Sequence, residues 1–599
     1  MLIFLRWAHA VLRWLGACAL GALNMLGRLV FVVIILLFLL IIVGVMSGDG
    51  LPGNIVLTLD LRGTIADSAS SNPLSLSSSV TTLDTVLALD AAGRDGRVKG
   101  ALIRVGSGTV SVAQAEELGT AIKRFRAKGK FVYVHSQGFN SAGLGDYLAA
   151  ASADQIWMQP HSPFMTAGTG GGEIFLRGLF DKIQAEPQIV KRAEYKSYAD
   201  MFMEKSMTAA DREQLTVLMK SVYDAAVAGV VADRKLDQAA VVAAFEASPQ
   251  IGEDAMRAKL IDRIGFDDDA QTAALARAGS GAKAVKMGQY IEAVITNGAI
   301  GSGPRVAVIM AAGDINDGSA GGSFDTASVI AGDDMAAAIR EAAKDDQVKA
   351  IVVRVDSPGG SVAASDQILD ALKKAHAKGK PIVISMASVA ASGGYYISTY
   401  ADRIVAQPGT ITGSIGVVTG KVSVGKSLAL IGIGSDQVGV GKNTLIDSEF
   451  TPYTPDQLAA VKREVDVIYA DFTQKVAEGR KLPLAKVQEI ARGRVWSGAD
   501  AKQQGLVDVL GGFWSATDEA KKLAHIPADS SVSFRLYPRP KGLLAAIDGL
   551  LGGSSDTAQA LGSVVTLMNT GTAKAVVGAA RELPRGGVEL RATGLPKNY

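Results

Sequence analysis

The chain has 599 residues, and its 61 lysines and arginines against 59 aspartates and glutamates give a formal net charge of +2. A charge so near zero, with no basic stretch that carries interleaved aromatic residues outside the N-terminus, argues against a nucleic-acid-binding protein. The single cysteine, Cys18, precedes the segment that we expect to cross a membrane, so the body beyond it can hold no internal disulfide and no cysteine-based metal site. We expect neither a metal nor a cofactor.

The first predicted element is a membrane anchor. Residues 29–46 (LVFVVIILLFLLIIVGVM) form an uninterrupted apolar stretch of 18 residues, just long enough to span a bilayer as a helix. Arg6, Arg13 and Arg28 precede it without an acidic residue, which predicts a cytoplasmic N-terminus (1–28) and an exported body. A cleavable signal peptide is the alternative, but the region before the apolar core is too long for one and no clear small-x-small cleavage site follows.

The body after this anchor is an internal duplication. The stretch from about 54 to 275 resembles the stretch from about 303 to 520. Residues 121–130 (AIKRFRAKGK) match residues 371–380 (ALKKAHAKGK) at six of ten positions, an offset of 250 that narrows to 246 further along each half. We therefore expect two repeats, at 54–280 and 303–530.

The fold class follows from the alternation of elements in each half. β-rich runs at 350–355, 381–386 and 403–407 alternate with helical patterns such as residues 362–377. This alternation predicts an α/β class with helices packed on a partly parallel sheet. The Gly- and Ala-rich joint at 278–282 is the expected boundary before the second repeat.

Two glycine-rich turns in the second half indicate acyl-transfer chemistry. Gly360, in Ser357-Pro358-Gly359-Gly360-Ser361, lies between a β-rich run and a helical pattern, where a free N–H can stabilise a developing oxyanion. Ser392 follows 32 positions later in Ala-Ala-Ser-Gly-Gly-Tyr-Tyr, at the start of a helical pattern that reaches Ala401, and Gly393 offers a second donor. The alternative is a pair of turns that only pack helix on strand. Two such turns at this separation favour Ser392 as a nucleophile.

The base for this serine is the open question. The histidines of the body, His135, His161, His376 and His525, have no triad context, and His376 resembles the solvated end of a helix. A lysine can act as the base if burial lowers its pKa and a hydroxyl orients it, and Ser414, in Thr412-Gly413-Ser414-Ile415-Gly416, is a candidate for that hydroxyl.

The duplication supplies two candidate lysines. In the first half the serine position holds Leu144, so that half cannot attack a carbonyl in the same way. The first half does carry Lys196, in Glu194-Tyr195-Lys196-Ser197-Tyr198, and an offset of 246 places Lys442 at the matching position of the second half.

These motifs together resemble the long form of the signal peptide peptidase A family. The motifs at 356–361, 391–396, 412–416 and 195–197 carry the resemblance, which covers the duplicated region and the anchor but not the last 60 or so residues. It implies a ClpP/crotonase-like fold in each repeat and a Ser/Lys dyad shared between the repeats, with Ser392 as nucleophile and Lys196 as base. Ser414 would orient that lysine, and Lys442 is the alternative base, in the position that the short relatives use.

The resemblance also implies the setting and the substrates. We expect a bacterial inner-membrane serine endopeptidase with a periplasmic catalytic body, bound to the bilayer through residues 29–46 and assembled as a homotetramer. Its expected substrates are cleaved signal peptides, bound as an extended strand. A non-catalytic membrane-linked scaffold and a crotonase-type acyl-CoA enzyme are the alternatives, and the tail at 531–599 carries no assignment.

Overall fold

The computed structural model describes residues 50–67, 80–140, 143–294, 299–319, 329–537 and 589–591. The chain divides into two units, residues 1–53 and 54–599, and all elements below belong to the second unit. The predicted anchor at 29–46 and the charges before it lie outside the described residues.

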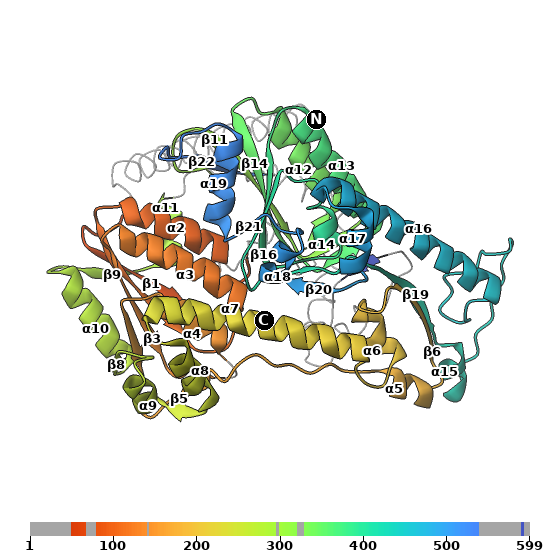
Figure 1. Cartoon of the computed structure of the whole chain (residues 1–599), viewed down its shortest axis with the longest axis horizontal. Coiled ribbons are helices and arrows are strands. Elements are labelled where there is room, and N and C mark those ends of the chain that lie inside the picture. Colours follow the sequence, from red (N-terminus) through yellow and green to blue (C-terminus); the bar gives the residue numbers. More distant parts are fainter. Residues whose placement is uncertain are drawn as a thin grey trace, which may run out of the picture. The chain divides into compact units, whose positions relative to one another are not determined.

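The first sheet contains six strands that all pair in parallel, in the order β8-β4-β3-β2-β1-β9 (Figure 1). Its central strands β1 to β3 are almost entirely buried and apolar, as expected of a parallel sheet covered on both faces. The strands are β1 (Ile55–Asp60), β2 (Val98–Val105), β3 (Phe131–Ser136), β4 (Gln155–Met158), β8 (Arg263–Ile264) and β9 (Lys283–Lys286).

Helices connect the strands of this first half, and several of them cover the first sheet. Ser111 begins one of them with a capping box, in which its hydroxyl accepts from the Gln114 N–H while the Gln114 side chain accepts from the Ser111 N–H. The helices are α2 (Thr82–Arg94), α3 (Val112–Ala127), α4 (Leu144–Ala151), α5 (Arg177–Lys182), α6 (Asp200–Met203), α7 (Ala209–Arg234), α8 (Gln238–Glu246), α9 (Gly252–Arg257), α10 (Asp267–Ala278) and α11 (Met287–Val294). A 3-10 turn at Ser197–Ala199 and the pair β5 (Pro163–Phe164) and β7 (Gln250–Ile251) complete this half.

The second sheet repeats this plan in the order β10-β22-β11-β14-β16-β17-β21. Its core strands β11, β14, β16 and β17 are parallel, β18 continues the pairing at the end of β16, and β20 pairs antiparallel with β18. The strands are β10 (Ala299–Ile300), β11 (Arg305–Ala312), β14 (Val348–Ser357), β16 (Ile382–Ala391), β17 (Arg403–Ala406), β18 (Ile411–Gly413), β20 (Val495–Ser497), β21 (Val509–Leu510) and β22 (Ser533–Tyr537).

The helices of the second half include α13 at the residues that the sequence predicted. One predicted helix is shorter than expected: α14 ends at Tyr396, because the Ser398 and Thr399 hydroxyls bond back to the Gly394 and Tyr396 carbonyls in a series of turns. The helices are α12 (Gly332–Lys344), α13 (Val362–Ala377), α14 (Gly393–Tyr396), α15 (Gly425–Leu430), α16 (Pro455–Arg480), α17 (Leu484–Ile490), α18 (Gly498–Gln503) and α19 (Phe513–Leu523).

Equivalent side chains in the two halves make equivalent contacts. Lys130 donates to the carbonyls of Asp95 and Val98, and Lys380, 250 residues later, donates to those of Asp345 and Val348. The Tyr147 hydroxyl donates to the Leu260 carbonyl, and that of Tyr395 donates to the Leu506 carbonyl. The mixed α/β fold and its duplication are therefore confirmed at the level of individual hydrogen bonds.

Each sheet extends past the predicted end of its repeat. β9 pairs with β1, so the first sheet continues beyond residue 280 and beyond the joint at 278–282. β22 pairs with β11 in the matching place, so the second sheet continues beyond residue 530. In both cases a late strand returns to pair with the first long strand of its own sheet and covers backbone groups that would otherwise be unpaired; β9 is the edge of the first sheet, whereas β22 is itself paired with β10.

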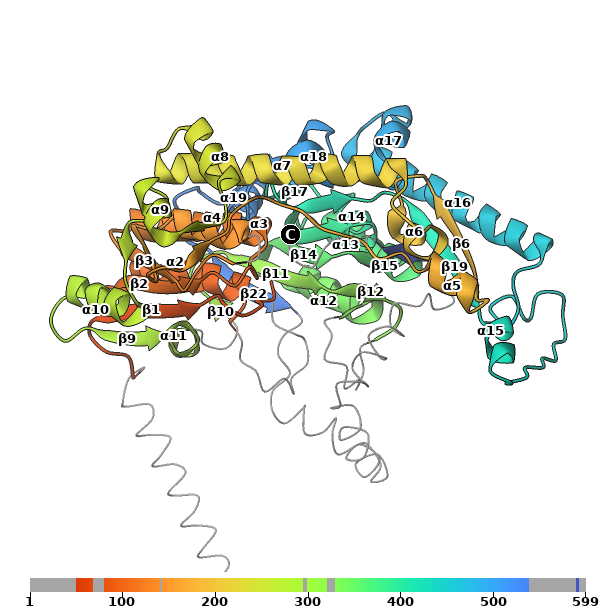
Figure 2. The ribbon, with the colours of Figure 1, turned by 90° about the horizontal axis from the view of Figure 1, so that it is seen from below.

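A third sheet joins the two halves, in the order β13-β12-β15-β23-β19-β6 (Figure 2). Its members are β6 (Glu186–Arg192), β12 (Asp314–Asn316), β13 (Val329–Ala331), β15 (Gly359–Ser361), β19 (Val417–Ser423) and β23 (Glu589–Arg591). β6 comes from the first half and pairs with β19 of the second half over seven residues on each strand. This pairing carries a segment of the first half to the predicted serine.

Helix α7 also connects the halves. It packs on α4 and α8 of its own half and on β20 and α18 of the other (Figures 1 and 2). Among the described residues it is the one helix long and apolar enough to cross a membrane, yet Leu215, Leu218 and Val222 are buried against the protein. Its apolar residues therefore serve the packing of the body.

Candidate active site

Lys196 and Ser392 lie side by side in the structure although 196 residues separate them. Lys196 Nζ is 2.7 Å from Ser392 Oγ, 3.0 Å from Ser414 Oγ and 3.2 Å from the Ser414 carbonyl oxygen. None of the three residues exposes more than 2% of its surface. The structure thus brings together the lysine of the first half and both serines of the second half.

Lys196 reaches this position because β6 pairs with β19. The chain leaves β6 at Arg192, and the amides of Ala193 and Tyr195 both donate to the Arg492 carbonyl of the second half. Gly493 packs directly against Lys196: a Cβ at that position would lie 2.6 Å from the Lys196 Cβ, and its φ of +80° also suits glycine. Any larger residue at 493 would displace the lysine.

Burial shifts the pKa of Lys196. Removal from water lowers its pKa well below 10.5, since the ammonium loses its hydration and no carboxylate of the described residues offsets that loss. Its partners are two hydroxyls and one carbonyl, which can orient a neutral amine. The arrangement therefore favours an uncharged Lys196 that can accept a proton from Ser392.

Ser392 and Ser414 both occupy backbone conformations that are rare for residues other than glycine. Ser392 has φ +55° and ψ −113°, and Ser414 has φ +50°. The Ser392 amide donates to the Gly413 carbonyl at 2.8 Å, and the Ser414 amide donates to the Arg494 carbonyl at 2.7 Å. A backbone conformation of this kind costs about 1 to 3 kcal/mol for each residue, and these hydrogen bonds hold both serines in it.

The predicted oxyanion donors, Gly360 and Gly393, lie against each other. A Cβ added to Gly393 would be 3.1 Å from the Gly360 nitrogen, so the first turn of α14 packs on β15. Gly393 begins α14, where the N–H groups have no partner within the helix. Because α14 has only four residues, its helix macrodipole contributes little, and stabilisation of an oxyanion would come from these individual amides.

In the first half, the turn that corresponds to the Gly360 turn donates hydrogen bonds to a carboxylate. Asp146 is buried there, and its carboxylate accepts from the amides of Gly108 and Val110. Burial raises the pKa of Asp146, while these backbone hydrogen bonds oppose the rise. Val110 stands 250 positions before Gly360, so the first half places a carboxylate at the amide that corresponds to a predicted oxyanion donor.

The other sequence candidates lie apart from this cluster. Lys442 is 76% exposed and its Nζ contacts Asp456 at 2.9 Å. Leu144, at the serine position of the first half, is buried at the start of α4. Among the described residues, the side-chain partner of Ser392 is Lys196 and not a histidine, and His376 is exposed beside Asp402.

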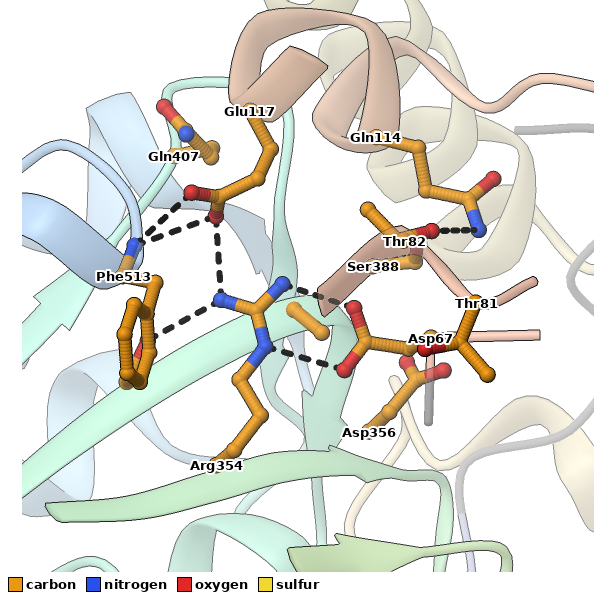
Figure 3. Close-up of polar contacts among 12 residues, drawn as sticks. Asp67, Thr81, Thr82, Gln114, Glu117, Arg354, Asp356, Ser388, Gln407 and Phe513 are labelled. Carbon is orange, nitrogen blue, oxygen red and sulfur yellow. Dashed lines mark hydrogen bonds and ion pairs between the residues drawn. The ribbon is translucent and has the colours of Figure 1, made fainter. Parts of the chain in front are cut away.

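A buried charge cluster beside the site was not found from the sequence. Arg354, two residues before Asp356 of the Asp-Ser-Pro-Gly-Gly motif, donates to Asp67 at 2.7 and 2.9 Å and to Glu117 at 3.0 Å (Figure 3). Asp67 and Glu117 belong to the first half, and all three side chains are at most 2% exposed. The sequence does contain a sign of this cluster, because Arg354 is a charged residue within the otherwise apolar run 350–355.

Asp356 lies next to this cluster and links the two strands that end at the site. Its Oδ1 accepts from the Val389 amide at 3.0 Å, which ties the end of β14 to β16 just before Ser392. Burial raises the pKa of Asp356 to about 7, and the negative charge of Asp67 adds to the effect. The cluster therefore joins the first half to both strands that carry the predicted oxyanion turn and serine.

Comparison with known proteins identifies the family of this chain. The model of "Peptidase family S49" matches residues 124–297 and 374–527, once in each half, and a Clp protease model matches residues 330–411. The chain is 30% identical to "Serine protease SPPA, chloroplastic" of Arabidopsis thaliana, over 83% of this chain and 73% of that protein.

Two bacterial relatives carry the name "Protease 4". The protein of Salmonella typhi is 32% identical over 68% of this chain and 66% of its own length. That of Haemophilus influenzae is 28% identical over 84% of this chain and 86% of its own length. With one family match in each half and similarity over most of its length, this chain belongs to peptidase family S49 and is a serine protease.

Proposed function

We propose that this protease is a membrane-anchored endopeptidase in which Ser392 is the nucleophile and Lys196 the general base, with released signal peptides and similar apolar peptides as substrates. The observation that carries the proposal is the 2.7 Å contact between Lys196 Nζ and Ser392 Oγ in a site without solvent access to either group. A nucleophile within hydrogen-bond reach of a base that a third group orients is the arrangement that covalent catalysis needs.

The first step is acylation. Ser392 Oγ attacks the carbonyl carbon of the scissile peptide bond and passes its proton to the neutral amine of Lys196. The Gly360 and Gly393 amides donate to the oxyanion that forms, in the way that the Val110 amide donates to the Asp146 carboxylate in the first half. The Lys196 ammonium then gives its proton to the leaving amine as the peptide bond breaks.

The second step is deacylation. Lys196, neutral again, takes a proton from a water molecule as that water attacks the ester carbonyl, and it returns the proton to Ser392 Oγ. Ser414 supports both steps, because its hydroxyl lies 3.0 Å from Lys196 Nζ and keeps the amine directed at Ser392. The original proton of Ser392 leaves with the amine product and a proton of the attacking water replaces it, so the enzyme is restored.

Substrate class and location are proposed from the sequence. An anchor at residues 29–46 would hold the body at the periplasmic face of the inner membrane, where cleaved signal peptides are released. We further propose a homotetramer, in which the repeats of four chains form one ring. An extended substrate would pair with a strand edge beside Gly360.

Hydrolysis of a peptide with an apolar residue before the scissile bond tests the proposal. We expect Ser392→Ala and Lys196→Ala to lower kcat by about a thousandfold or more, since each removes a group that acts in every bond-making step. Lys442→Ala is the matched control, an exposed lysine at the equivalent repeat position, and should retain wild-type activity. Loss of activity in Lys442→Ala with retention in Lys196→Ala would contradict the assignment.

A further inference from the structure

Gln214, on α7, is a buried amide that contacts the segment carrying Lys196. Its side chain is almost fully removed from water, with 2% of the residue exposed. The Gln214 Nε2 donates to the Tyr195 carbonyl at 3.0 Å and to the Ser197 hydroxyl at 3.2 Å. These two residues stand directly before and after Lys196. One amide group therefore holds the chain on both sides of the proposed base.

The oxygen of the same Gln214 side chain contacts the second half of the protein. Its Oε1 accepts from the Val495 amide of β20 at 3.3 Å. Val495 pairs with Gly413, whose carbonyl accepts from the Ser392 amide. The residue before Val495 accepts from the Ser414 amide through its own carbonyl. A single side chain thus connects the segment of the proposed base to the strand that holds both serines.

Two acidic residues fix the direction of the Gln214 amide. Its Nε2 also donates to Oδ1 of Asp211, one turn earlier on α7, at 3.1 Å, and Asp211 is fully buried. Burial raises the pKa of Glu173, and a hydrogen bond with Asp211 adds to the rise, so Glu173 can keep a proton and donate it to Asp211. Asp211 can then accept from both neighbours. The NH2 group of Gln214 faces acceptors and its oxygen faces the Val495 donor, so a reversed amide would lose these bonds.

A second connection between the same segments lies at the surface. The Tyr195 hydroxyl and the Arg494 guanidinium both donate to the Glu213 carboxylate, at 2.8 and 3.1 Å. The Glu213 side chain is 52% exposed, so water and salt screen this contact. A hydrogen bond inside the protein is electrostatically stronger than one in water. The buried Gln214 is therefore the firmer of the two connections.

We propose that Gln214 is a positioning residue of the protease, which fixes the Lys196 segment against β20 and so sets the place of the lysine amine relative to Ser392 and Ser414. This inference rests on the proposed function and adds a residue that acts through the proposed base. Gln214 takes no part in the chemical steps. Its role is to keep two segments from different halves of the chain in register.

Loss of the Gln214 amide should change both the rate and its pH dependence. Lys196 Nζ is 2.7 Å from Ser392 Oγ, and a displacement of about 1 Å can lower a rate by about a hundredfold. The Tyr195 carbonyl and the Val495 amide would also lose a buried partner, which water would have to replace. Water that enters beside this segment would hydrate the lysine and move its pKa back toward 10.5.

The test replaces Gln214 by methionine, which has a similar length but forms none of these hydrogen bonds. We expect kcat for an apolar peptide to fall by about tenfold or more, with KM within about twofold of wild type, because the hydrogen bonds of Gln214 are made to the protein itself. The acidic limb of kcat/KM against pH reports protonation of the base in the free enzyme. Its midpoint should rise by about one pH unit in Gln214→Met.

Ser221→Ala is the matched control. Ser221, also on α7, shares a hydrogen bond of 2.7 Å with the Ser497 hydroxyl of β20. Its removal therefore weakens the contact between the same helix and the same strand but leaves the Lys196 segment untouched. We expect the kcat and the pH midpoint of this variant to equal those of wild type.

A second variant, Gln214→Asn, covers the case in which the methionine variant does not fold. It keeps an amide in the buried site but is one methylene shorter, so it cannot span Tyr195 and Val495. Its kcat and pH midpoint should change in the same directions. A wild-type kcat or an unshifted midpoint in the Gln214 variants would overturn the inference, and so would equal changes in Ser221→Ala. Full activity of Lys196→Ala would instead overturn the proposed function.

Discussion

Lys196 shows how a residue with a proposed catalytic role can carry a cost in stability. Its burial lowers its pKa well below 10.5, so at pH values between this lowered pKa and 10.5 the folded protein holds a neutral amine while the unfolded chain carries an ammonium. Folding must therefore release a proton from this lysine. The same desolvation that we propose prepares Lys196 as a base weakens the folded state.

The pH dependence of stability tests this account. Between the lowered pKa and 10.5 the unfolded state binds more protons than the folded state, so the contribution of Lys196 to the unfolding free energy rises with pH, by about 1.4 kcal/mol per unit. We expect Lys196→Met to be more stable relative to wild type at pH 7 than at pH 10, because methionine has no proton to lose. Thermal unfolding at four pH values between 7 and 10 measures the difference, and Lys442→Met, an exposed lysine, serves as control. A difference that does not change with pH would refute a neutral Lys196.

At the scale of secondary-structure elements, β14 depends on a charge cluster from the other half of the protein. Arg354 projects from β14 to Asp67 and Glu117, while Glu117 also accepts from the Phe513 amide at the start of α19 (Figure 3). Arg354 stands only three residues before Ser357, where the Ser-Pro-Gly-Gly turn begins. The position of that turn is therefore fixed by residues that lie more than 200 positions away in the sequence.

Substitution of Arg354 should affect both stability and activity. We expect Arg354→Leu to destabilise the protein by about 3 to 5 kcal/mol, because it leaves two buried carboxylates without their partner. Its kcat should fall in the same variant, since the Ser-Pro-Gly-Gly turn loses its support. Arg403→Leu is the control: its ion pair with Glu519 is 3.4 Å long and the arginine is 46% exposed, so its loss should cost less than about 1 kcal/mol. Thermal unfolding and peptide hydrolysis measure both effects, and equal melting temperatures for the two variants would contradict the role of the cluster.

At the scale of the whole molecule, each half contributes a part that the other lacks. The first half has Lys196 but carries Leu144 at the serine position, and the second half has Ser392 but holds Lys442 on its surface. The pairing of β6 with β19 brings Lys196 and Ser392 together within one chain. One chain should therefore contain one complete site.

Mixing two inactive variants tests whether the site lies within one chain. Ser392→Ala keeps Lys196 and Lys196→Ala keeps Ser392, so a site shared between chains would be restored in mixed oligomers. We expect no recovery of peptide hydrolysis when the two variants are co-expressed and purified together. Recovery to a substantial fraction of wild-type activity would show that the lysine of one chain serves the serine of another.

Much of the fold could be predicted from the sequence because local patterns specify it. The apolar runs at 350–355 and 381–386 became β14 and β16, and the helical pattern at 362–377 became α13 without a change of boundary. The helix after Ser392 was the exception. The hydroxyl groups of Ser398 and Thr399 donate to backbone carbonyls there and compete with the helical hydrogen bonds. The spacing of apolar residues carries no information about such bonds, so it could not predict where this helix ends.

By itself the sequence determined the duplication and the α/β class, and it was enough to propose Ser392 as the reactive serine together with its glycine turns. These depend on motifs and periodicities that lie within short stretches of chain. Only the tertiary structure showed that Lys196 is buried beside Ser392 while Lys442 is exposed, because burial depends on which distant segments surround a residue. This difference is why we propose Lys196 as the base, since the burial of an amine lowers its pKa. The Arg354 cluster and the position of β23 were also decided at that level, since both join segments more than 200 residues apart.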